Sequence, residues 1–365
     1  MKWSLKIAQV AGIPIYLHLT FVLLIAFIAI SAGVSEGSLT AMIGGVAFPL
    51  ALFGSVLLHE LGHALAARRF DIHTRDITLL PIGGVARLER MPEKPIQEMW
   101  VALAGPAVNV VIAAALFLIL LVAGGLEPVT ATSLSEGSFL NRLMVVNISL
   151  VLFNLIPAFP MDGGRVARAL LAMRLEYTRA TQVAASLGQG IALLLGFIGL
   201  FSNPFLVFIA LFVWIGAAQE SSMVQMKSAL DNIPVSRAML TDFDTLSPTD
   251  SLSRATQLIL SGYQHDFPVT ANGSVVGILT RDDLVKALAE HNENVFVSHV
   301  MRKEFKVVDS SQMLDVVSRQ MQEPGHPVLP VVHNGTLVGL LNMENVGEFL
   351  MIQRAIRTRQ NARAI

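Results

Sequence analysis

Long apolar runs dominate the first 230 residues, separated by short polar connectors. A helix needs about 20 mainly apolar residues to cross a bilayer, and six runs come close to or exceed that length. The pattern predicts membrane-spanning helices, with ends soft by several residues, at 17–34, 41–67, 98–124, 139–158, 181–201 and 204–224. Beyond residue 230 the apolar runs are short and lie between turn-forming residues, which is typical of an α/β domain in water.

The connector 70–97 carries a different pattern. Two short apolar runs, Ile77–Leu80 and Val85–Leu88, flank the turn-forming sequence Pro-Ile-Gly-Gly. We expect a short re-entrant β-hairpin at the cytoplasmic edge of the membrane, because non-helical backbone at membrane depth must be buried in protein or line a cavity. A plain cytoplasmic connector is the alternative that this pattern leaves open.

Composition separates the two halves further. The chain has 365 residues, is 53% hydrophobic and only 15% charged, whereas soluble domains carry about 25% charge. Residues 1–230 hold 26 charged side chains and the shorter segment 231–365 holds 27. This composition therefore argues against an ordinary cytosolic enzyme. The net charge of −1 argues against a nucleic-acid partner, and the absence of cysteine excludes disulfides and thiolate metal ligands.

Basic residues are distributed unevenly between the loops. The loops 32–40, 125–138 and 202–203 contain no lysine or arginine, whereas the connectors on the other side contain many. Because basic loops stay in the cytoplasm, this asymmetry predicts an even number of spans with both termini cytoplasmic. The first apolar run lacks a signal-peptide cleavage pattern. These features fit a multi-pass protein of a prokaryotic inner membrane.

The second apolar run contains His59-Glu60-Leu61-Gly62-His63. Positions i and i+4 share one face of a helix, so both imidazoles can reach one Zn²⁺ while Glu60 serves as general base. Ionisable residues in an apolar helix are costly in lipid and mark a functional site by default. The alternative is a set of polar residues satisfied inside a helix bundle.

A catalytic zinc usually takes three protein ligands, so one more is needed. Asp162 follows the fourth apolar run, in a segment that starts at Asn154. On spacing alone it could equally be the N-cap of a helix beginning at Gly163. His18 and Glu98 are weaker candidates, since His18 suits a membrane interface and Glu98 suits the first turn of a helix.

These motifs together resemble those of the site-2 proteases, a family of intramembrane zinc metalloproteases. His59 to His63 matches the family's H-E-x-x-H motif, and Asn154, Pro157, Asp162 and Gly163 match N-x-x-P-x-x-x-x-D-G. The resemblance implies that Asp162 is the third zinc ligand and that Asn154 binds or positions the substrate. It also implies a single-span membrane protein as substrate, such as a membrane-tethered transcriptional regulator.

The mechanism expected of such a site follows from its residues. Zinc lowers the pKa of bound water to about 7, and Glu60 takes the proton and returns it to the leaving nitrogen. A transmembrane substrate must unwind locally before its amides are accessible. The predicted hairpin could hold the unwound segment as an added strand.

Residues 235–350 contain an internal repeat with a constant offset of 62. Val235-Ser-Arg-Ala-Met239 corresponds to Val297-Ser-His-Val-Met301, and Gly277 corresponds to Gly339. The two copies resemble a tandem pair of CBS domains. The predicted organisation is a transmembrane metalloprotease domain, two CBS domains and a basic C-terminal tail, over 1–228, 235–292, 297–350 and 351–365.

CBS pairs often bind adenine nucleotides, and Thr280 and Asp283 occupy the positions that grip the ribose in the resembling modules. Asn342 and Asn345 replace them in the second copy, so at most one nucleotide site looks complete. An ordinary helix cap at Thr280 is an equal alternative. A module that forms a homodimer without binding a ligand is another.

A transporter or channel regulated by CBS domains is the main competing function. Such a site needs metal ligands but no general base beside them, and paired broken helices in two halves would be expected. No repeat is detectable in 1–230, so the protease interpretation is favoured.

Overall fold

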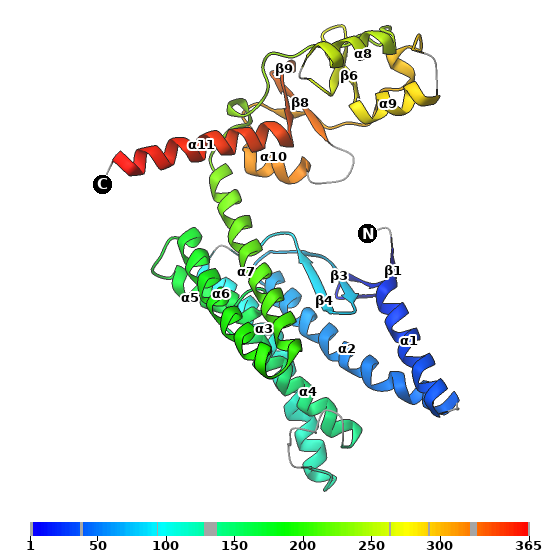
Figure 1. The fold of residues 1–365 in the computed structure, drawn as a ribbon, viewed down its shortest axis with the longest axis vertical. Coiled ribbons are helices and arrows are strands. Elements are labelled where there is room, and N and C mark those ends of the chain that lie inside the picture. Colours follow the sequence, from blue (N-terminus) through cyan, green and yellow to red (C-terminus); the bar gives the residue numbers. More distant parts are fainter. Residues whose placement is uncertain are drawn as a thin grey trace. The chain divides into compact units, whose positions relative to one another are not determined.

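The computed structural model describes residues 3–36, 39–92, 94–127, 137–262, 264–290, 293–321 and 327–363. Contacts between residues divide the chain into two units, Met1–Val224 and Gln225–Ile365. The first unit consists mainly of long helices with one small sheet, and the second is an α/β unit (Figure 1). Each unit is described by itself below.

Apolar helices make up most of the first unit (Figure 1). They are α1 (Leu19–Glu36), α2 (Leu39–Arg68), α3 (Pro95–Val122), α4 (Phe139–Asn154), α5 (Asp162–Ala172), α6 (Tyr177–Phe201) and α7 (Pro204–Leu230). The last of these continues into the second unit. The sequence predicts a polytopic helical membrane domain over these residues. The long apolar helices confirm that fold class.

The described residues contain four helices that are long and apolar enough to span a membrane. These are Met42–Arg68, Pro95–Val122, Tyr177–Phe201 and Pro204–Leu230. The apolar helices Leu19–Val34 and Phe139–Asn154 are shorter. The helix predicted over 139–158 ends at Asn154, consistent with the restriction that Pro157 places on the residue before it. The expected count of six spans therefore stays a prediction.

A four-stranded sheet lies beside α2. Its strands, β1 (Ser4–Val10), β2 (Ile13–His18), β3 (Thr74–Leu80) and β4 (Gly83–Leu88), are arranged in that order. The predicted hairpin forms as β3–β4, so the plain connector is wrong. The first two strands were not predicted. Strand β2 runs parallel to β3, and Ile15 and Ile77 pair across it. Ile13, Ile77 and Leu61 share one core cluster that joins the sheet to α2.

The second unit contains two similar α/β copies. The first comprises α8 (Leu252–Ser261), β5 (Phe267–Ala271), β6 (Ser274–Leu279) and α9 (Arg281–Glu290). The second comprises β7 (Val308–Asp309), α10 (Leu314–Met321), β8 (Val328–His333), β9 (Thr336–Asn342) and α11 (Met343–Arg363). Helix α11 covers most of the segment predicted as a separate basic tail over 351–365.

The two copies exchange backbone hydrogen bonds symmetrically. The Leu240 N–H donates to the Leu340 carbonyl at 2.8 Å, and the Leu340 N–H donates back at 3.0 Å. The same reciprocal pair joins Ile278 and Arg302 at 3.0 and 2.8 Å, each residue 62 positions from its counterpart. The repeat in the sequence is therefore a repeat in structure, and each copy completes the other.

The repeated glycines explain how closely the copies approach. A Cβ at Gly277 would lie 2.6 Å from the sulfur of Met301, and one at Gly339 would lie 2.7 Å from the sulfur of Met239. These are the residue types that the offset of 62 pairs in the sequence. A side chain at either glycine would push the copies apart.

Candidate active site

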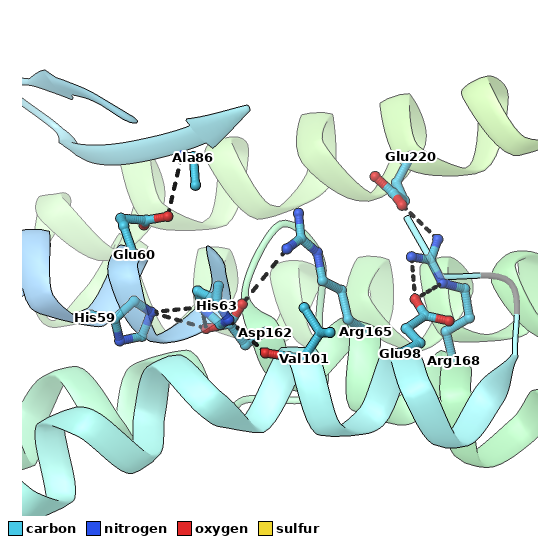
Figure 2. Close-up of polar contacts among 10 residues, drawn as sticks. All are labelled: His59, Glu60, His63, Ala86, Glu98, Val101, Asp162, Arg165, Arg168 and Glu220. Carbon is cyan, nitrogen blue, oxygen red and sulfur yellow. Dashed lines mark hydrogen bonds and ion pairs between the residues drawn. The ribbon is translucent and has the colours of Figure 1, made fainter. Parts of the chain in front are cut away.

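Three buried side chains from two helices converge at one point. His59 and His63 lie one turn apart on α2, and Asp162 is the first residue of α5. The Asp162 Oδ2 atom lies 3.2 Å from His59 Nε2 and 3.1 Å from His63 Nε2, and the two Nε2 atoms are 3.1 Å apart (Figure 2). The exposed fractions are 7%, 4% and 6%. Asp162 therefore lies in the first turn of α5 and is not its N-cap.

Both imidazoles present an unprotonated Nε2 to this point. The Nδ1 of His59 donates to Asn109 Oδ1 at 2.5 Å, and the Nδ1 of His63 donates to the Val101 carbonyl at 2.7 Å. With each Nδ1 as donor, three lone-pair atoms face one another, which is unfavourable without a cation between them. Ligands of a tetrahedral zinc, at about 2.0–2.1 Å from the ion, lie about 3.3 Å apart. The donor set and its spacing thus fit Zn²⁺.

The side-chain amides of Asn109 and Asn147 form a series of hydrogen bonds that orients the His59 imidazole. Asn109 Nδ2 donates to Asn147 Oδ1 at 2.8 Å, and Asn147 Nδ2 donates to Ser55 Oγ at 3.2 Å. Asn109 and Asn147 are fully buried. Asn109 thereby links α3 to α4. Its contact with His59 has no sequence signal, because the two residues are 50 positions apart.

Two glycines make room for the ligands. The Cα of Gly105 on α3 faces the imidazoles, and a Cβ there would overlap His63 Nε2 and come within 2.7 Å of His59 Nε2. A Cβ at Gly163 would overlap the carbonyls of Leu155 and Ile156. Any side chain at Gly105 would therefore fill the metal position, and one at Gly163 would displace the turn that delivers Asp162.

Glu60 points from α2 toward the sheet, away from the turn that carries Asp162. Its Oε2 accepts a hydrogen bond from the backbone N–H of Ala86 at 3.2 Å (Figure 2). Ala86 lies on β4, the outer strand of the sheet. The carboxylate next to the metal ligands is therefore fixed by the free edge of the predicted hairpin.

The remaining sequence candidates lie elsewhere. Asn154 ends α4, where its Nδ2 donates to the Leu150 carbonyl at 3.0 Å. His18 contacts Thr20 at 2.7 Å and does not belong to the ligand group. Glu98 pairs with Arg168 instead of a metal. Arg165, which the sequence did not single out, has its Nη1 3.9 Å from Asp162 Oδ1.

The comparisons with known proteins agree with this geometry. The model of peptidase family M50 matches residues 47–137 and 129–196, and the CBS domain model matches 235–290 and 297–351. A zinc metalloprotease of Methanocaldococcus jannaschii is 32% identical over 347 residues, which are 95% of this chain and 96% of the relative. This chain belongs to peptidase family M50. It is a zinc metalloprotease of this family with CBS domains.

Two further similarities cover only part of this chain. Stage IV sporulation protein FB of Bacillus subtilis is 29% identical over 156 residues, 42% of this chain and 51% of the relative. The solved structure of a site-2 protease from Methanocaldococcus jannaschii covers 60% of this chain and 95% of its own, at 37% identity and a TM-score of 0.43. Proteins of the M50 family use Zn²⁺, and His59, His63 and Asp162 form the potential metal site of this member.

In the CBS pair, Thr280 and Asp283 form a helix cap. The Asp283 N–H donates to Thr280 Oγ1 at 3.2 Å at the start of α9. The Asp283 carboxylate also accepts two hydrogen bonds from Arg302, at 2.5 and 3.0 Å. Burial raises the pKa of Asp283, but these hydrogen bonds outweigh it and hold the pKa below its ordinary value. The capping interpretation accounts for both residues, and ribose binding stays a prediction.

A cleft of about 210 Å³ forms where residues of the two copies meet. Its lining includes Asn342 and Asn345, the counterparts of Thr280 and Asp283. The charged and titratable side chains of the lining are Asp266, Glu344, Glu348 and His265.

Proposed function

We propose that this chain is an intramembrane zinc endopeptidase that hydrolyses a peptide bond in or near the transmembrane segment of a single-span, membrane-tethered regulatory protein. The residues would act in a multi-pass protein of a prokaryotic inner membrane, with the metalloprotease domain over 1–228. The CBS domains over 235–292 and 297–350 would modulate the activity. One observation carries the proposal. His59 and His63 of α2, a helix long and apolar enough to span a membrane, converge with Asp162 of α5, and Glu60 lies next to His59 in the chain.

His59, His63 and Asp162 would hold the zinc ion, and Glu60 would move the proton. A bound zinc supplies an activated water and polarises the peptide carbonyl. Glu60 immediately follows one ligand in the chain, so its carboxylate can reach the attacking water once it leaves the Ala86 N–H. The same carboxyl then protonates the leaving nitrogen. Asn154, at the end of α4, would position the substrate.

Strand β4 would hold the unwound substrate. It is the outer strand of the sheet, and the Ala86 N–H points away from β3 because it donates to Glu60. Along a strand, backbone groups alternate in direction, and no other strand among the described residues pairs with the edge that carries this N–H. An extended segment would pair there. A substrate carbonyl bonded to Ala86 would release the Glu60 carboxylate for catalysis.

The CBS pair would sense a small ligand or would hold two copies of the chain together. An adenine nucleotide at the first copy would have to share Asp283 with Arg302. Isothermal titration of the purified full chain with AMP and ATP, on wild type and Asp283→Asn, separates the two roles. Nucleotide binding that Asp283→Asn abolishes supports the sensor, and absent binding together with a dimer by light scattering supports the second role.

Zinc content and cleavage together test the catalytic assignment. We expect wild type and Glu60→Gln to purify with about one zinc each and Asp162→Asn to lose it. Only wild type should cleave a co-expressed panel of single-span proteins, because removing a general base costs about 10²–10⁴-fold in rate. Zinc and activity retained by Asp162→Asn would refute its role as ligand. Wild type without zinc would overturn the peptidase proposal and favour a CBS-regulated transporter.

A further inference from the structure

Two arginines lie one turn apart on α5 and have opposite surroundings. Arg168 is fully buried, and its guanidinium donates to Glu98 Oε1 at 2.7 Å and to Glu220 Oε1 at 2.5 Å. Arg165 has 30% of its side chain exposed and points toward the metal ligands instead. Figure 2 shows Arg165 between the ligands and Arg168. Arg168 therefore joins helices, whereas Arg165 faces the site.

The guanidinium of Arg165 is only weakly engaged. Its Nη1 lies 3.9 Å from Asp162 Oδ1, which is an ion-pair distance but too long for a hydrogen bond. Within the part of the chain that the structure describes, no other group pairs with this guanidinium. A guanidinium has five N–H donors, and a partly buried charge without hydrogen bonds is costly. These donors therefore suit a ligand that enters the site.

Arg165 also lies on the side of the ligand group that the proposed general base occupies. In Figure 2, the guanidinium of Arg165 and the carboxylate of Glu60 both lie above the three ligands, in the direction of β4. The positive charge of Arg165 acts on both the Glu60 and the Asp162 carboxylates. A peptide carbonyl that is attacked by a water molecule beside Glu60 would therefore lie close to this cation.

The attack on the peptide bond creates a charge that needs such a cation. The water oxygen bonds to the peptide carbon, the π electron pair of the carbonyl moves to its oxygen, and Glu60 takes the water proton. One negative charge thereby moves from the Glu60 carboxylate to the carbonyl oxygen. A preorganised donor aimed at that oxygen stabilises the tetrahedral intermediate more than the substrate. Arginine suits this task because it stays protonated and presents several donors in one plane.

We propose that Arg165 is a catalytic residue whose guanidinium donates to the negatively charged carbonyl oxygen of the tetrahedral intermediate. Asp162 holds the cation beside the site through Oδ1, while its Oδ2 faces the two histidines. The inference rests on the proposed function, since it adds a residue to the same reaction. The competing role is that of a positioning residue that only fixes the Asp162 carboxylate.

Kinetics and zinc affinity of variants of the full chain separate these roles, with the best-cleaved protein of the panel as substrate. We expect Arg165→Ala to lower kcat about 10²–10³-fold, the usual loss for one missing donor to such an oxygen. KM and the zinc affinity measured by competition with a chelator should not change. Arg165→Lys should recover part of the loss, because it keeps the charge. The matched control is Arg174→Ala, at an exposed arginine just after α5, which should behave as wild type.

Binding of an inhibitor gives a readout that does not depend on turnover. A phosphinate peptide that copies the cleaved sequence carries a tetrahedral, negatively charged centre in place of the peptide bond. Its Kd should rise about 10²-fold in Arg165→Ala, because the variant lacks the donor to the anionic oxygen. In Arg174→Ala the Kd should equal that of wild type.

Several results would overturn the proposal. Loss of zinc affinity in Arg165→Ala would show that the residue only holds Asp162, and a raised KM with normal kcat would show that it only binds the substrate. Normal turnover or an unchanged phosphinate Kd would also contradict it. Arg165→Met, which keeps the apolar stem, replaces Arg165→Ala if the latter does not purify. A wild type that cleaves nothing refutes the peptidase proposal itself, so the two failures are distinguishable.

Discussion

Each imidazole of the metal site has its Nδ1 held by a partner on α3. For His59 the partner is the side chain of Asn109, and for His63 it is the Val101 carbonyl. Such partners fix the tautomer and the ring orientation, and they raise the basicity of the coordinating nitrogen. Only the Asn109 contact can be removed by substitution.

Replacing Asn109 with alanine should therefore weaken zinc binding about 10- to 100-fold. Competition with a chelator, followed by metal analysis, measures the affinity. Asn141→Ala is the matched control, because Asn141 is also buried, at 4% exposed, but bonds to Ser138 and Gly125 instead of a ligand. Equal zinc affinity in both variants would contradict the role assigned to Asn109.

The Asp283–Arg302 ion pair makes stability depend on pH. The folded pKa of Asp283 lies below its ordinary value, so the pair contributes fully above about pH 4 and the contribution fades as pH falls through the lowered pKa. Asp283→Asn should lower the free energy of unfolding by about 1 kcal/mol at pH 7, which lowers the midpoint temperature by about 3 °C. In strong acid the variant and wild type should be equally stable. Thermal unfolding from pH 2 to 7 tests this. Asp282→Asn, at a neighbouring side chain that is 86% exposed, is the matched control.

Among the strands and helices, β4 contacts the proposed general base directly, because its Ala86 N–H donates to Glu60. Ile77 on β3 is a poor place for a test, because it is fully buried and pairs with both Ala86 and Ile15. Ala86→Pro removes the N–H that points away from β3 and that donates to Glu60. It should lower turnover at least tenfold while about one zinc is retained, because the substrate loses its backbone partner.

Cleavage and zinc content of Ala86→Pro should be compared with those of Ala86→Ser, which keeps the N–H. Near-normal turnover of Ala86→Ser is expected. If Ala86→Pro cleaves as fast as wild type, substrate does not pair with this edge.

Local signals predicted some elements and missed others. The i, i+4 spacing of His59 and His63 and the turn between β3 and β4 are encoded within a few residues. Strands β1 and β2 were missed because β2 pairs with β3, about 60 residues later, and its apolar residues merged with those of α1. The contacts of Arg168 with Glu98 and Glu220 were missed for the same reason, since these partners are 70 and 52 positions away in the sequence. From the sequence alone, Glu98 is an ordinary acidic residue in the first turn of a helix. Its ion pair with Arg168 is visible only in the structure.

At the scale of the whole molecule, the distribution of basic residues predicts which loops face the cytoplasm. The natural chain contains no cysteine, so a single introduced thiol reports on one loop. Ser202→Cys, between α6 and α7, should react with a membrane-impermeant maleimide in intact cells. Arg174→Cys, between α5 and α6, should react only after lysis. Labelling of both sites in intact cells, or of neither, would contradict the predicted topology.

The parallel pairing of β2 with β3 also constrains how the chain is made. Helices α1 and α2 lie between the two strands in the sequence. If both helices cross the membrane, as the apolar pattern predicts, the strands can meet only when both ends of that helical pair return to one side. During synthesis β2 emerges first and must wait until residue 80 has left the ribosome. Insertion of the first two helices and closure of the sheet are therefore coupled, and a nascent chain in which α2 inserts the wrong way round cannot complete the sheet that fixes Glu60.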